Sequence, residues 1–471
     1  MKTIIYGAGN YAKRVYEYLY AQNLARDVLY FAVTNLENNP DSLYGVPVKS
    51  VDSVRSELKK NFVIIAVSPK KEGINKIIKM CDKEHYRLIS QAEYWDLPRE
   101  TEALLYSLPL ENNLIFISCF QGQEYKCNMK YIAEYILHSG EDFKIIWNTR
   151  PDFFERFTVP SEIKKVEKKS IEYRRAIHTA KVIIANDEMK ELGYKKKGQY
   201  VINTWHGTGP FKKVNASIAN RSMDYLESLR DQQQKFDLYI SNSQDNTQMF
   251  RESFLYDGEI AEWGSPRIDI LFQNNKKKIV EIRDKLGIPQ NKSVVLFAPT
   301  FRENALASYE NYILKPKMVK KALNERFKSD FVFLYRYHHH LYHAGQTLEL
   351  QDGGVDVTDY LDIMELLIIT DVLITDYSSV MWDFSLMKKP VFLYQPDLDE
   401  YLIKDKGLYM PVDKWPYPKA NSQKGLCDQI KQFDEKAYLD KLHNFFENDK
   451  SYDDGHACER LFNRIKEVCG I

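Results

Sequence analysis

Residues 203–213, which read NTWHGTGPFKK, combine the side chains that best suit a chemical step. His206 follows a predicted strand at 200–205, and histidine is the side chain best suited to take a proton near neutral pH. Two glycines let the backbone approach a ligand, Thr208 offers a hydroxyl, and Lys212 adds positive charge. A lone histidine beside a turn is usually packed or solvated. The density of glycine, threonine and lysine here favours a catalytic base.

Two further predicted strand ends carry arginine. Residues 297–303 read FAPTFRE with Arg302, and residues 334–343 read LYRYHHHLYH with Arg336 and His338. Arginine suits bidentate recognition of phosphate. Zinc binding is the rival interpretation of the histidines, but they lack a companion carboxylate spacing, and consecutive residues at a strand end point in different directions. A phosphate clamp of Arg336 and one histidine is therefore favoured over a metal site.

A fourth strand end, residues 374–384 (ITDYSSVMWDF), carries two hydroxyls at the start of a predicted helix. Ser378, Ser379 and the free N–H groups of a helix start make an anion site. The alternative is that Asp376 or Ser378 simply caps the helix, and both readings can hold together. Loops at strand ends of two parallel sheets can converge on a cleft. Their shared affinity for phosphate predicts a donor that contains a diphosphate.

The elements that position these segments alternate between apolar strands and amphipathic helices, which implies parallel sheets covered on both faces. We predict an α/β fold with two tandem domains of this kind after a smaller one, and a polar linker at 96–111. The expected strands are 3–6, 28–33, 62–67, 114–118, 144–147, 182–185, 200–205, 238–241, 293–297, 331–335, 372–375 and 390–394, with helices through Leu19 and near 129–137.

Near the N-terminus, Gly7, Gly9 and Ala12 form a GxGxxA loop between a strand and a helix, as in dinucleotide-binding domains. An NAD site would also need an acidic residue at the end of the second strand, where Thr34 and Asn35 stand. We favour a module that uses these glycines for packing, or one that binds a nucleotide-related ligand other than NAD. The hypothesis that the protein is an oxidoreductase rests on this loop alone.

The bulk composition excludes several classes of protein. The 471 residues contain 66 basic and 66 acidic side chains, so the net charge of zero does not indicate a nucleic-acid partner. The six cysteines are scattered, as reduced thiols are in cytosolic proteins. No apolar run reaches the ~20 residues of a membrane span, and no signal peptide is recognisable. We expect a cytoplasmic protein, with peripheral contact to the membrane left open.

Several ordered segments resemble the CDP-glycerol glycerophosphotransferase family of teichoic-acid polymerases and primases. They are WHGTGPFKK, GSPRIDIL (264–271), LFAPTFRE, YRYHHH and LITDYSSVMWDFSLMKKPVFLYQPDLDEY (373–401). The segments ISCFQGQEYKCNMKYIAEYIL (117–137) and DDGHACERLFNRI (453–465) are similar to the same family. The resemblance covers roughly residues 112–468.

The resemblance implies a GT-B fold: an acceptor-side domain at 112–275, and a CDP-polyol donor domain at 276–471 with a closing C-terminal helix. Residues 1–100 would be a Rossmann-like accessory domain. His206 is implied as the base and His338 as a second catalytic residue at the donor phosphates, without a metal or cofactor. The other site residues that the resemblance implies are, for the donor, Arg302, Ser378, Ser379 and Asp383, and, for the acceptor, Gly122, Tyr125 and Asn128. From residue type and position we add Thr300 and Arg336 on the donor side, and Thr208 and Lys212 on the acceptor side.

The implied reaction moves a polyol phosphate from CDP-glycerol, or from CDP-ribitol, to a hydroxyl of a teichoic-acid-like, capsular or lipid-linked polymer. CMP is released, and His206 removes the proton of the acceptor hydroxyl. One alternative is a GT-B glycosyltransferase that uses a nucleotide sugar. The other is a non-catalytic nucleotide-binding subunit.

Overall fold

The computed structural model describes residues 2–21, 24–67, 73–89, 105–189, 192, 195–207, 212–300, 314–337, 354–404 and 407–471. These residues form two compact units. Unit 1 comprises Met1–Phe116, Lys165–Lys181 and Lys196–Gln199. Unit 2 comprises Ile117–Lys164, Val182–Lys195 and Tyr200–Ile471.

Unit 1 contains a six-stranded sheet in the order β3-β4-β2-β1-β5-β6. Its strands are β1 (Thr3–Tyr6), β2 (Val28–Val33), β3 (Ser42–Leu43), β4 (Val46–Ser50), β5 (Phe62–Ile65) and β6 (Tyr86–Leu88). The pairs of β1 with β2 and β5, of β2 with β4 and of β5 with β6 are parallel. Only β3, on β4, pairs antiparallel among these described strands.

Both faces of this sheet are covered, because successive side chains of a strand point to opposite faces. Ile5 belongs to the core that includes Ala12 and Val15 of α1 (Asn10–Ala21). Ile4 belongs to the core on the other face, which includes Ile77 of α2 (Ile74–Ile78). Unit 1 also contains α5 (Ile171–Thr179), whose Arg174 forms an ion pair with Glu17 of α1.

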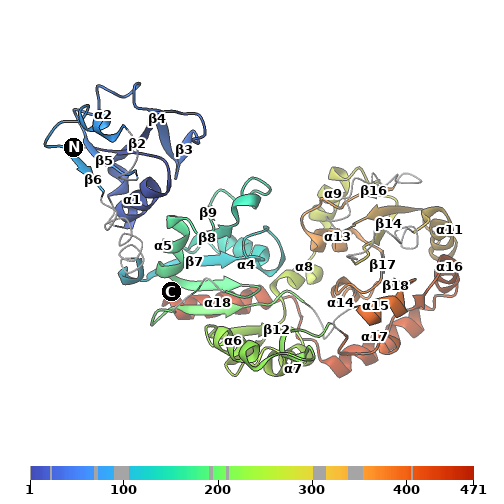
Figure 1. The fold of residues 1–471 in the computed structure, drawn as a ribbon. Helices are drawn as coiled ribbons and strands as arrows, with labels where there is room; N and C mark the ends of the chain where they lie inside the picture. The colour runs from blue at the N-terminus through green and yellow to red at the C-terminus, as the bar shows by residue number, and fades with distance from the viewer. Residues whose placement is uncertain are drawn as a thin grey trace. The chain divides into compact units, whose positions relative to one another are not determined.

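A second sheet has the order β13-β12-β11-β10-β7-β8-β9, and a third has the order β16-β15-β14-β17-β18-β19. The second sheet consists of β7 (Glu111–Ser118), β8 (Lys144–Thr149), β9 (Ile163–Glu167), β10 (Ala180–Ala185), β11 (Tyr200–Asn203), β12 (Leu238–Ser241) and β13 (Glu259–Glu262). The third consists of β14 (Ser293–Phe297), β15 (Phe331–Tyr335), β16 (Val355–Asp356), β17 (Val372–Thr375), β18 (Val391–Tyr394) and β19 (Lys419–Ala420). The parts of unit 2 built on these sheets are called the second-sheet half and the third-sheet half (Figure 1).

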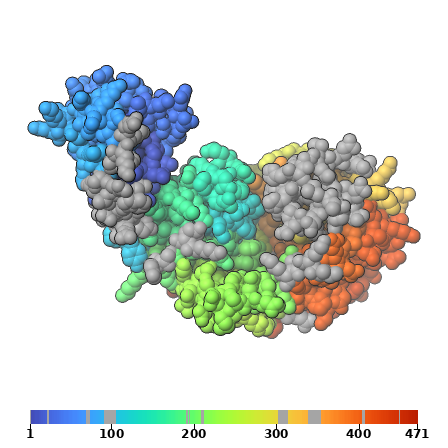
Figure 2. Space-filling model, viewed as in Figure 1, coloured from blue at the N-terminus to red at the C-terminus, as the bar shows by residue number. Residues whose placement is uncertain are grey.

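Helices of unit 2 pack against both sheets. They are α4 (Cys127–His138), α6 (Met223–Gln233), α7 (Gln244–Glu252), α8 (Asp269–Phe272), α9 (Lys276–Lys285), α11 (Pro316–Phe327), α13 (Ile363–Ile369), α14 (Val380–Ser385), α15 (Leu398–Lys404), α16 (Gln423–Lys431), α17 (Glu435–Asp449) and α18 (Ala457–Cys469). Several begin at a side-chain cap: Ser222 and Ser243 accept from the N–H groups of Tyr225 and Asn246. Figure 2 shows the yellow-green atoms of α6 and α7 side by side on one face of unit 2.

The helix α18 returns from the third-sheet half and packs on α4 of the second-sheet half. Its start is held by Asp269, whose carboxylate accepts from the N–H groups of Ala457 at 3.0 Å and Cys458 at 2.7 Å. Further along the helix, Arg464 donates to both oxygens of Glu259 on β13. The closing helix therefore completes the second-sheet half (Figure 1).

The α/β class and the strands expected at 28–33, 238–241, 293–297, 331–335 and 372–375 are confirmed. The strand expected at 200–205 ends at Asn203, because the backbone of Trp205 has a positive φ of 51° that a strand cannot accommodate. The prediction that the linker extends to residue 111 is wrong, because β7 begins at Glu111. The first three residues of this strand are polar, so the apolar pattern used to predict the strand starts only at Leu114. Residues 90–104 lie outside the described residues, and the division into three domains stays a prediction.

Candidate active site

His206 lies just beyond the carboxyl end of β11, in a loop closed by neighbouring strand ends. Its Nδ1 is 2.7 Å from the carbonyl oxygen of Asn186, which follows β10. A carbonyl oxygen only accepts, so Nδ1 carries the proton and Nε2 keeps its lone pair. The imidazole lies against the rings of Trp205 and Phe120, with centroid distances of 4.1 and 5.1 Å. This geometry presents Nε2 as a proton acceptor.

The environment keeps the imidazole of His206 neutral. Burial lowers its pKa to about 4, which the bond to the Asn186 carbonyl opposes. The positive charges of Arg267 and Lys126 lower the pKa further. A neutral imidazole at physiological pH is ready to accept a proton from a hydroxyl.

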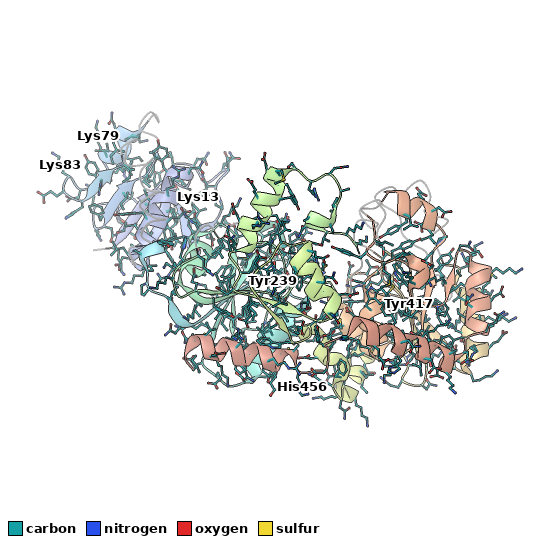
Figure 3. The ribbon with its side chains drawn as sticks, turned by 90° about the horizontal axis from the view of Figure 1, so that it is seen from below. Lys13, Lys79, Lys83, Tyr239, Tyr417 and His456 are labelled. Carbon is teal, nitrogen blue, oxygen red and sulfur yellow. The ribbon has the colours of Figure 1, made fainter. Side chains whose placement is uncertain are left out.

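The loop of His206 is supported from the sheet below. Asn203 accepts from the N–H of Trp205 at 2.8 Å and donates to the hydroxyl of Tyr239 at 3.1 Å. Tyr239, labelled in Figure 3, is buried and its ring packs against Phe250 and Tyr256. The asparagine of the NTWHG segment thus fixes the loop on an aromatic core.

A second support comes from Asn128 at the start of α4. Its amide donates to the carbonyl oxygens of Trp205 at 3.0 Å and Thr204 at 3.2 Å, and its Oδ1 accepts from the N–H of Arg267 at 3.1 Å. The guanidinium of Arg267 donates to both oxygens of Asp383 on α14 at 3.2 Å. Both charged side chains are buried. One connected network thus joins the His206 loop to the third-sheet half.

Asp453 adds a third ionisable group beside this ion pair. Its carboxylate accepts from the N–H of Ser265 at 2.7 Å and from Asn242 at 3.2 Å. Burial raises its pKa to about 7; Asp383 acts in the same direction and Arg267 opposes it. The network therefore contains a carboxyl group that titrates near neutral pH.

Lys130 forms another buried ion cluster between the two halves of unit 2. Its Nζ lies 2.7 Å from Asp362 and 2.7 Å from Glu365, at the start of α13. Tyr131 donates to the same Asp362 at 2.9 Å. Burial would raise the pKa of Glu365, but Lys130 outweighs it and the pKa falls to about 2. The cluster fixes α4, the helix that carries Asn128.

The predicted donor residues lie at the carboxyl ends of β14 and β17. Asp376 accepts from both the N–H and the hydroxyl of Thr300, at 2.8 and 2.7 Å. Ser379 is the first flanking residue of α14, and the hydroxyl of Ser378 accepts from the N–H of Val380 at 3.4 Å. Asp376 therefore braces the neighbouring strand end, and Ser378 makes a weak capping contact.

Arg336 lies at the end of β15. Its N–H donates to the carbonyl of Phe297 at 2.9 Å, and its guanidinium donates to the carbonyl oxygens of Tyr360 and, at 3.5 Å, Val357. Burial lowers the pKa of Arg336. Part of its donor fork is therefore committed to the backbone beyond β16.

On the predicted acceptor side, Gly122 has φ +94°, and a Cβ there would stand 2.9 Å from the N of Arg150. The turn after β7 therefore requires glycine. Tyr125 is buried with its ring 4.8 Å from that of Trp147. Both residues shape the loop that holds Phe120 against the imidazole.

Lys212 lies beyond the His206 loop and reaches the third-sheet half. It forms an isolated antiparallel bridge with Leu408, and the N–H of Lys213 donates to Gly407 at 3.0 Å. The Nζ of Lys212 is 5.2 Å from the centre of the Tyr401 ring. The segment after the histidine is thus anchored on the opposite half.

Three predicted site residues, Thr208, Arg302 and His338, lie outside the described residues. Within the described ranges, no group of histidine, cysteine and acidic side chains could hold a metal ion. No role was predicted from the sequence for Asn186, Lys130, Arg267 or Asp453. Arg267 and Asp453 stand inside segments that carry the family resemblance, whereas a backbone carbonyl such as that of Asn186 leaves no signal in residue type.

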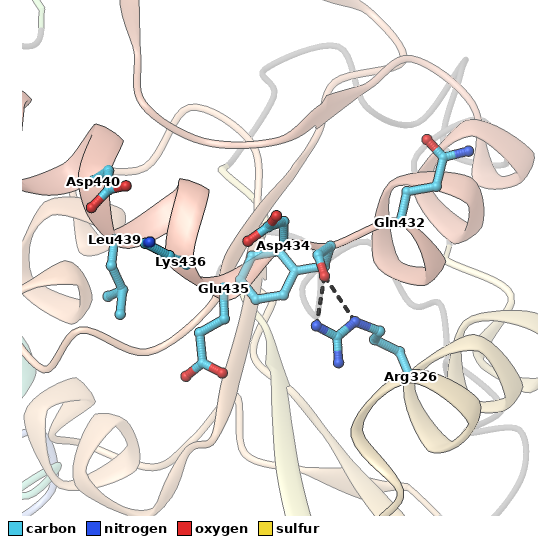
Figure 4. A pocket seen from close by; sticks show the side chains of 8 residues that line it. Arg326, Gln432, Asp434, Glu435, Lys436, Leu439 and Asp440 are labelled. Atoms are coloured by element: carbon cyan, nitrogen blue, oxygen red, sulfur yellow. Dashed lines mark hydrogen bonds between the residues drawn. The ribbon is translucent and has the colours of Figure 1, made fainter.

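The third-sheet half also has a pocket outside the candidate site (Figure 4). It forms where α11, α16 and α17 meet, and its lining includes Gln432, Asp434, Glu435 and Lys436. Arg326 donates to the carbonyl of Phe433 at 2.8 and 2.6 Å. Arg326 stands in the last turn of α11, which leads into β15. The pocket therefore lies near the amino end of this strand, whereas the candidate site lies at carboxyl ends of strands.

The family model of the CDP-glycerol:poly(glycerophosphate) glycerophosphotransferases matches residues 101–467. The chain belongs to this family. It is 33% identical over 380 residues to the teichoic acid glycerol-phosphate transferase of Staphylococcus aureus, across 78% of this chain and 95% of that protein. It is 26% identical over 376 residues to the teichoic acid poly(glycerol phosphate) polymerase of Bacillus spizizenii, across 77% and 93%.

Among solved structures, the wall teichoic acid polymerase TagF aligns with a TM-score of 0.68 at 30% identity, covering 80% of this chain and 96% of that one. The family, the GT-B-type fold and the assignment as a polyol-phosphate transferase are confirmed. Described helices of this family member are too short or too polar to cross a membrane. The roles of individual site residues stay predictions.

Proposed function

We propose that the chain transfers glycerol phosphate from CDP-glycerol to a hydroxyl of a growing teichoic-acid-type polymer and releases CMP. The main support is the neutral, half-buried imidazole of His206, whose Nδ1 is held by the Asn186 carbonyl. The relative named a teichoic acid glycerol-phosphate transferase supports the choice of polyol. So does a similar TagF structure obtained after a soak with CDPG.

In the proposed reaction, Nε2 of His206 takes the proton of the acceptor hydroxyl as its oxygen attacks the β-phosphorus of the donor. The new O–P bond forms while the bond from that phosphorus to the CMP oxygen breaks, and CMP leaves with the electron pair. Thr300, Ser378 and Ser379 would bind the donor phosphates. Arg267 and Asn128 would position the His206 loop without touching substrate. Such reactions depend chiefly on positioning and on electrostatic stabilisation.

The resemblance assigns His338 and Arg302 to the donor phosphates, and both stay proposals. The remaining assignments are Arg336 and Asp383 on the donor side, and Gly122, Tyr125, Thr208 and Lys212 on the acceptor side. The buried contacts of Tyr125 and Asp383 support a role in shaping the site.

CDP-ribitol is the second candidate donor. It is favoured by the teichoic acid poly(ribitol-phosphate) polymerase of Bacillus spizizenii, which is 28% identical over 369 residues. This chain spans about half of that relative, 57% of its length. We also propose a cytoplasmic enzyme that meets a lipid-linked acceptor at the membrane surface, with domains at 1–100, 112–275 and 276–471.

The test measures CMP release by the purified chain from CDP-glycerol, CDP-ribitol and a UDP-sugar, with mass analysis of the products. His206→Ala should lose about 10²–10⁴-fold in turnover, which is the usual contribution of a general base. His443→Ala is the matched control, because His443 is an exposed histidine on α17 that contacts only Glu447 among the described ion pairs. Near-normal turnover of His206→Ala would remove the base assignment. No CMP release from either CDP-polyol would remove the proposed function.

A further inference from the structure

The sheet of unit 1 carries a cavity of about 520 Å³ at the carboxyl ends of three neighbouring strands. β1 lies in the middle of the sheet, with β2 beside it on one side and β5 on the other. The strands that follow β1 in the chain are thus added first on one side of it and later on the opposite side. The order of strands therefore reverses at β1. Ligands of open α/β sheets bind outside the carboxyl ends of the strands at such a reversal. The transfer reaction assigned to unit 2 makes no use of this cavity.

Two glycines line this cavity, and the fold requires glycine at only one of the two positions. Gly7 has φ +123°, and a Cβ there would stand 2.6 Å from the carbonyl oxygen of Ala66, so the backbone itself requires glycine. Gly9 has no positive φ, and a Cβ there would meet nothing within 4 Å. The fold does not require glycine at position 9. Its missing side chain leaves space between the cavity and the first turn of α1, where helix N–H groups lack intrahelical partners.

The opposite wall of the cavity follows β2 and is held in place by its own hydrogen bonds. Thr34 bonds to the hydroxyl of Tyr6, and Asn35 accepts from the N–H of Glu37 at 3.0 Å. Asn39 donates to the carbonyl of Asn35 at 2.9 Å. This wall offers amide and carboxylate groups, which suit the hydroxyls of a sugar.

The charges around the cavity indicate where an anionic group and where neutral hydroxyl groups of a ligand would bind. Its described lining contains no lysine or arginine, and Glu37 is its one carboxylate. An anionic group would therefore meet the backbone N–H groups at Gly9, whereas neutral hydroxyls would meet Asn35 and Glu37. Thr34 stands where an NAD site would place an acidic residue, and its hydroxyl is bonded to Tyr6.

We propose that this cavity binds a nucleoside 5′-phosphate, with its phosphate at Gly9 and its ribose hydroxyls at Asn35 and Glu37. The three strand ends supply the cavity, the open position at Gly9 admits the phosphate, and the wall after β2 reads the ribose. The N-terminal module thereby gives the enzyme a nucleotide site in addition to its donor site.

The test is calorimetric titration of the full chain with the 5′-mono- and diphosphates of cytidine, uridine, adenosine and guanosine. Gly9→Asp and Gly9→Asn form a matched pair, because the two side chains have the same size and both favour the position before a helix. They differ in charge and in the amide NH2 group that asparagine carries. At least one nucleotide should bind both the wild type and the Gly9→Asn variant. The affinity of the Gly9→Asp variant for that nucleotide should be tenfold lower or more.

Glu37→Ala tests the other end of the cavity without a change near the glycines. It should weaken the same ribonucleotide several-fold more than its 2′,3′-dideoxy counterpart. The proposal is overturned if Gly9→Asp and Gly9→Asn bind all eight nucleotides alike, or if none binds outside the donor site. CMP release from CDP-glycerol, measured on the same variants, should stay near the wild-type rate. The proposed transfer reaction and this site can therefore fail independently.

Discussion

The low pKa of His206 predicts the pH dependence of the transfer reaction. An imidazole with the ordinary pKa of about 6.5 would be neutral in only about a tenth of molecules at pH 5.5. A pKa of about 4 leaves nearly all of them neutral at that pH. If His206 is the base, kcat/KM at pH 5.5 should therefore be nearly ten times higher than an ordinary histidine would allow. A bound diphosphate should raise the pKa again, so the acid limb of kcat should lie above that of kcat/KM.

The assay is the initial rate of CMP release between about pH 4 and about pH 9, at donor concentrations below and above KM. Phe120→Ser opens the apolar cover of the imidazole and should move the acid limb of kcat/KM upward, toward the ordinary value. Phe120→Leu keeps an apolar cover and should leave the limb low. A wild-type limb near pH 6.5, or the same limb in both variants, would refute the argument that burial sets the pKa of His206.

The buried networks give three further predictions. Arg267→Met should remove the positive charge beside the buried carboxylate of Asp383 and cost about 3–5 kcal/mol in the free energy of unfolding of unit 2. Arg267→Lys should recover part of that loss, and Arg267→Met with Asp383→Leu should cost less than the sum of the single changes in a double-mutant cycle. Lys130 holds the pKa of Glu365 at about 2, so the stability from this pair is full above about pH 4.5 and is lost as the pH falls to about 2. Lys130→Met should therefore lower the melting temperature more at pH 7 than at about pH 2, as scanning calorimetry would show. Asp453 has a pKa of about 7 in the folded protein, above its unfolded value. Its contribution to stability is therefore full below about pH 4 and declines as the pH rises to about 7, and Asp453→Asn should remove that slope from denaturant titrations.

The sequence predicted the strands well where apolar runs coincide with the hydrogen-bonded ladder, as at 293–297 and 331–335. It failed where backbone geometry decides, because no residue pattern announces the positive φ of Trp205 that ends β11 early. The sequence indicated the His206 loop as a candidate site because glycine, threonine and lysine gather within one short segment, and its catalytic role stays a prediction. The pairing of Arg267 with Asp383 was not, since the two residues lie 116 positions apart and each is locally an ordinary charged residue.

The return of α18 to the second-sheet half has a consequence for biosynthesis. Asp269 lacks its partners on Ala457 and Cys458 until that helix has been made. The apolar side chains of Leu461 and Ile465, buried in the finished protein, are also absent until then. The half that holds His206 is translated first but is completed only after the third-sheet half has emerged from the ribosome. During this interval the uncovered surface of the second-sheet half is exposed to aggregation and to chaperones.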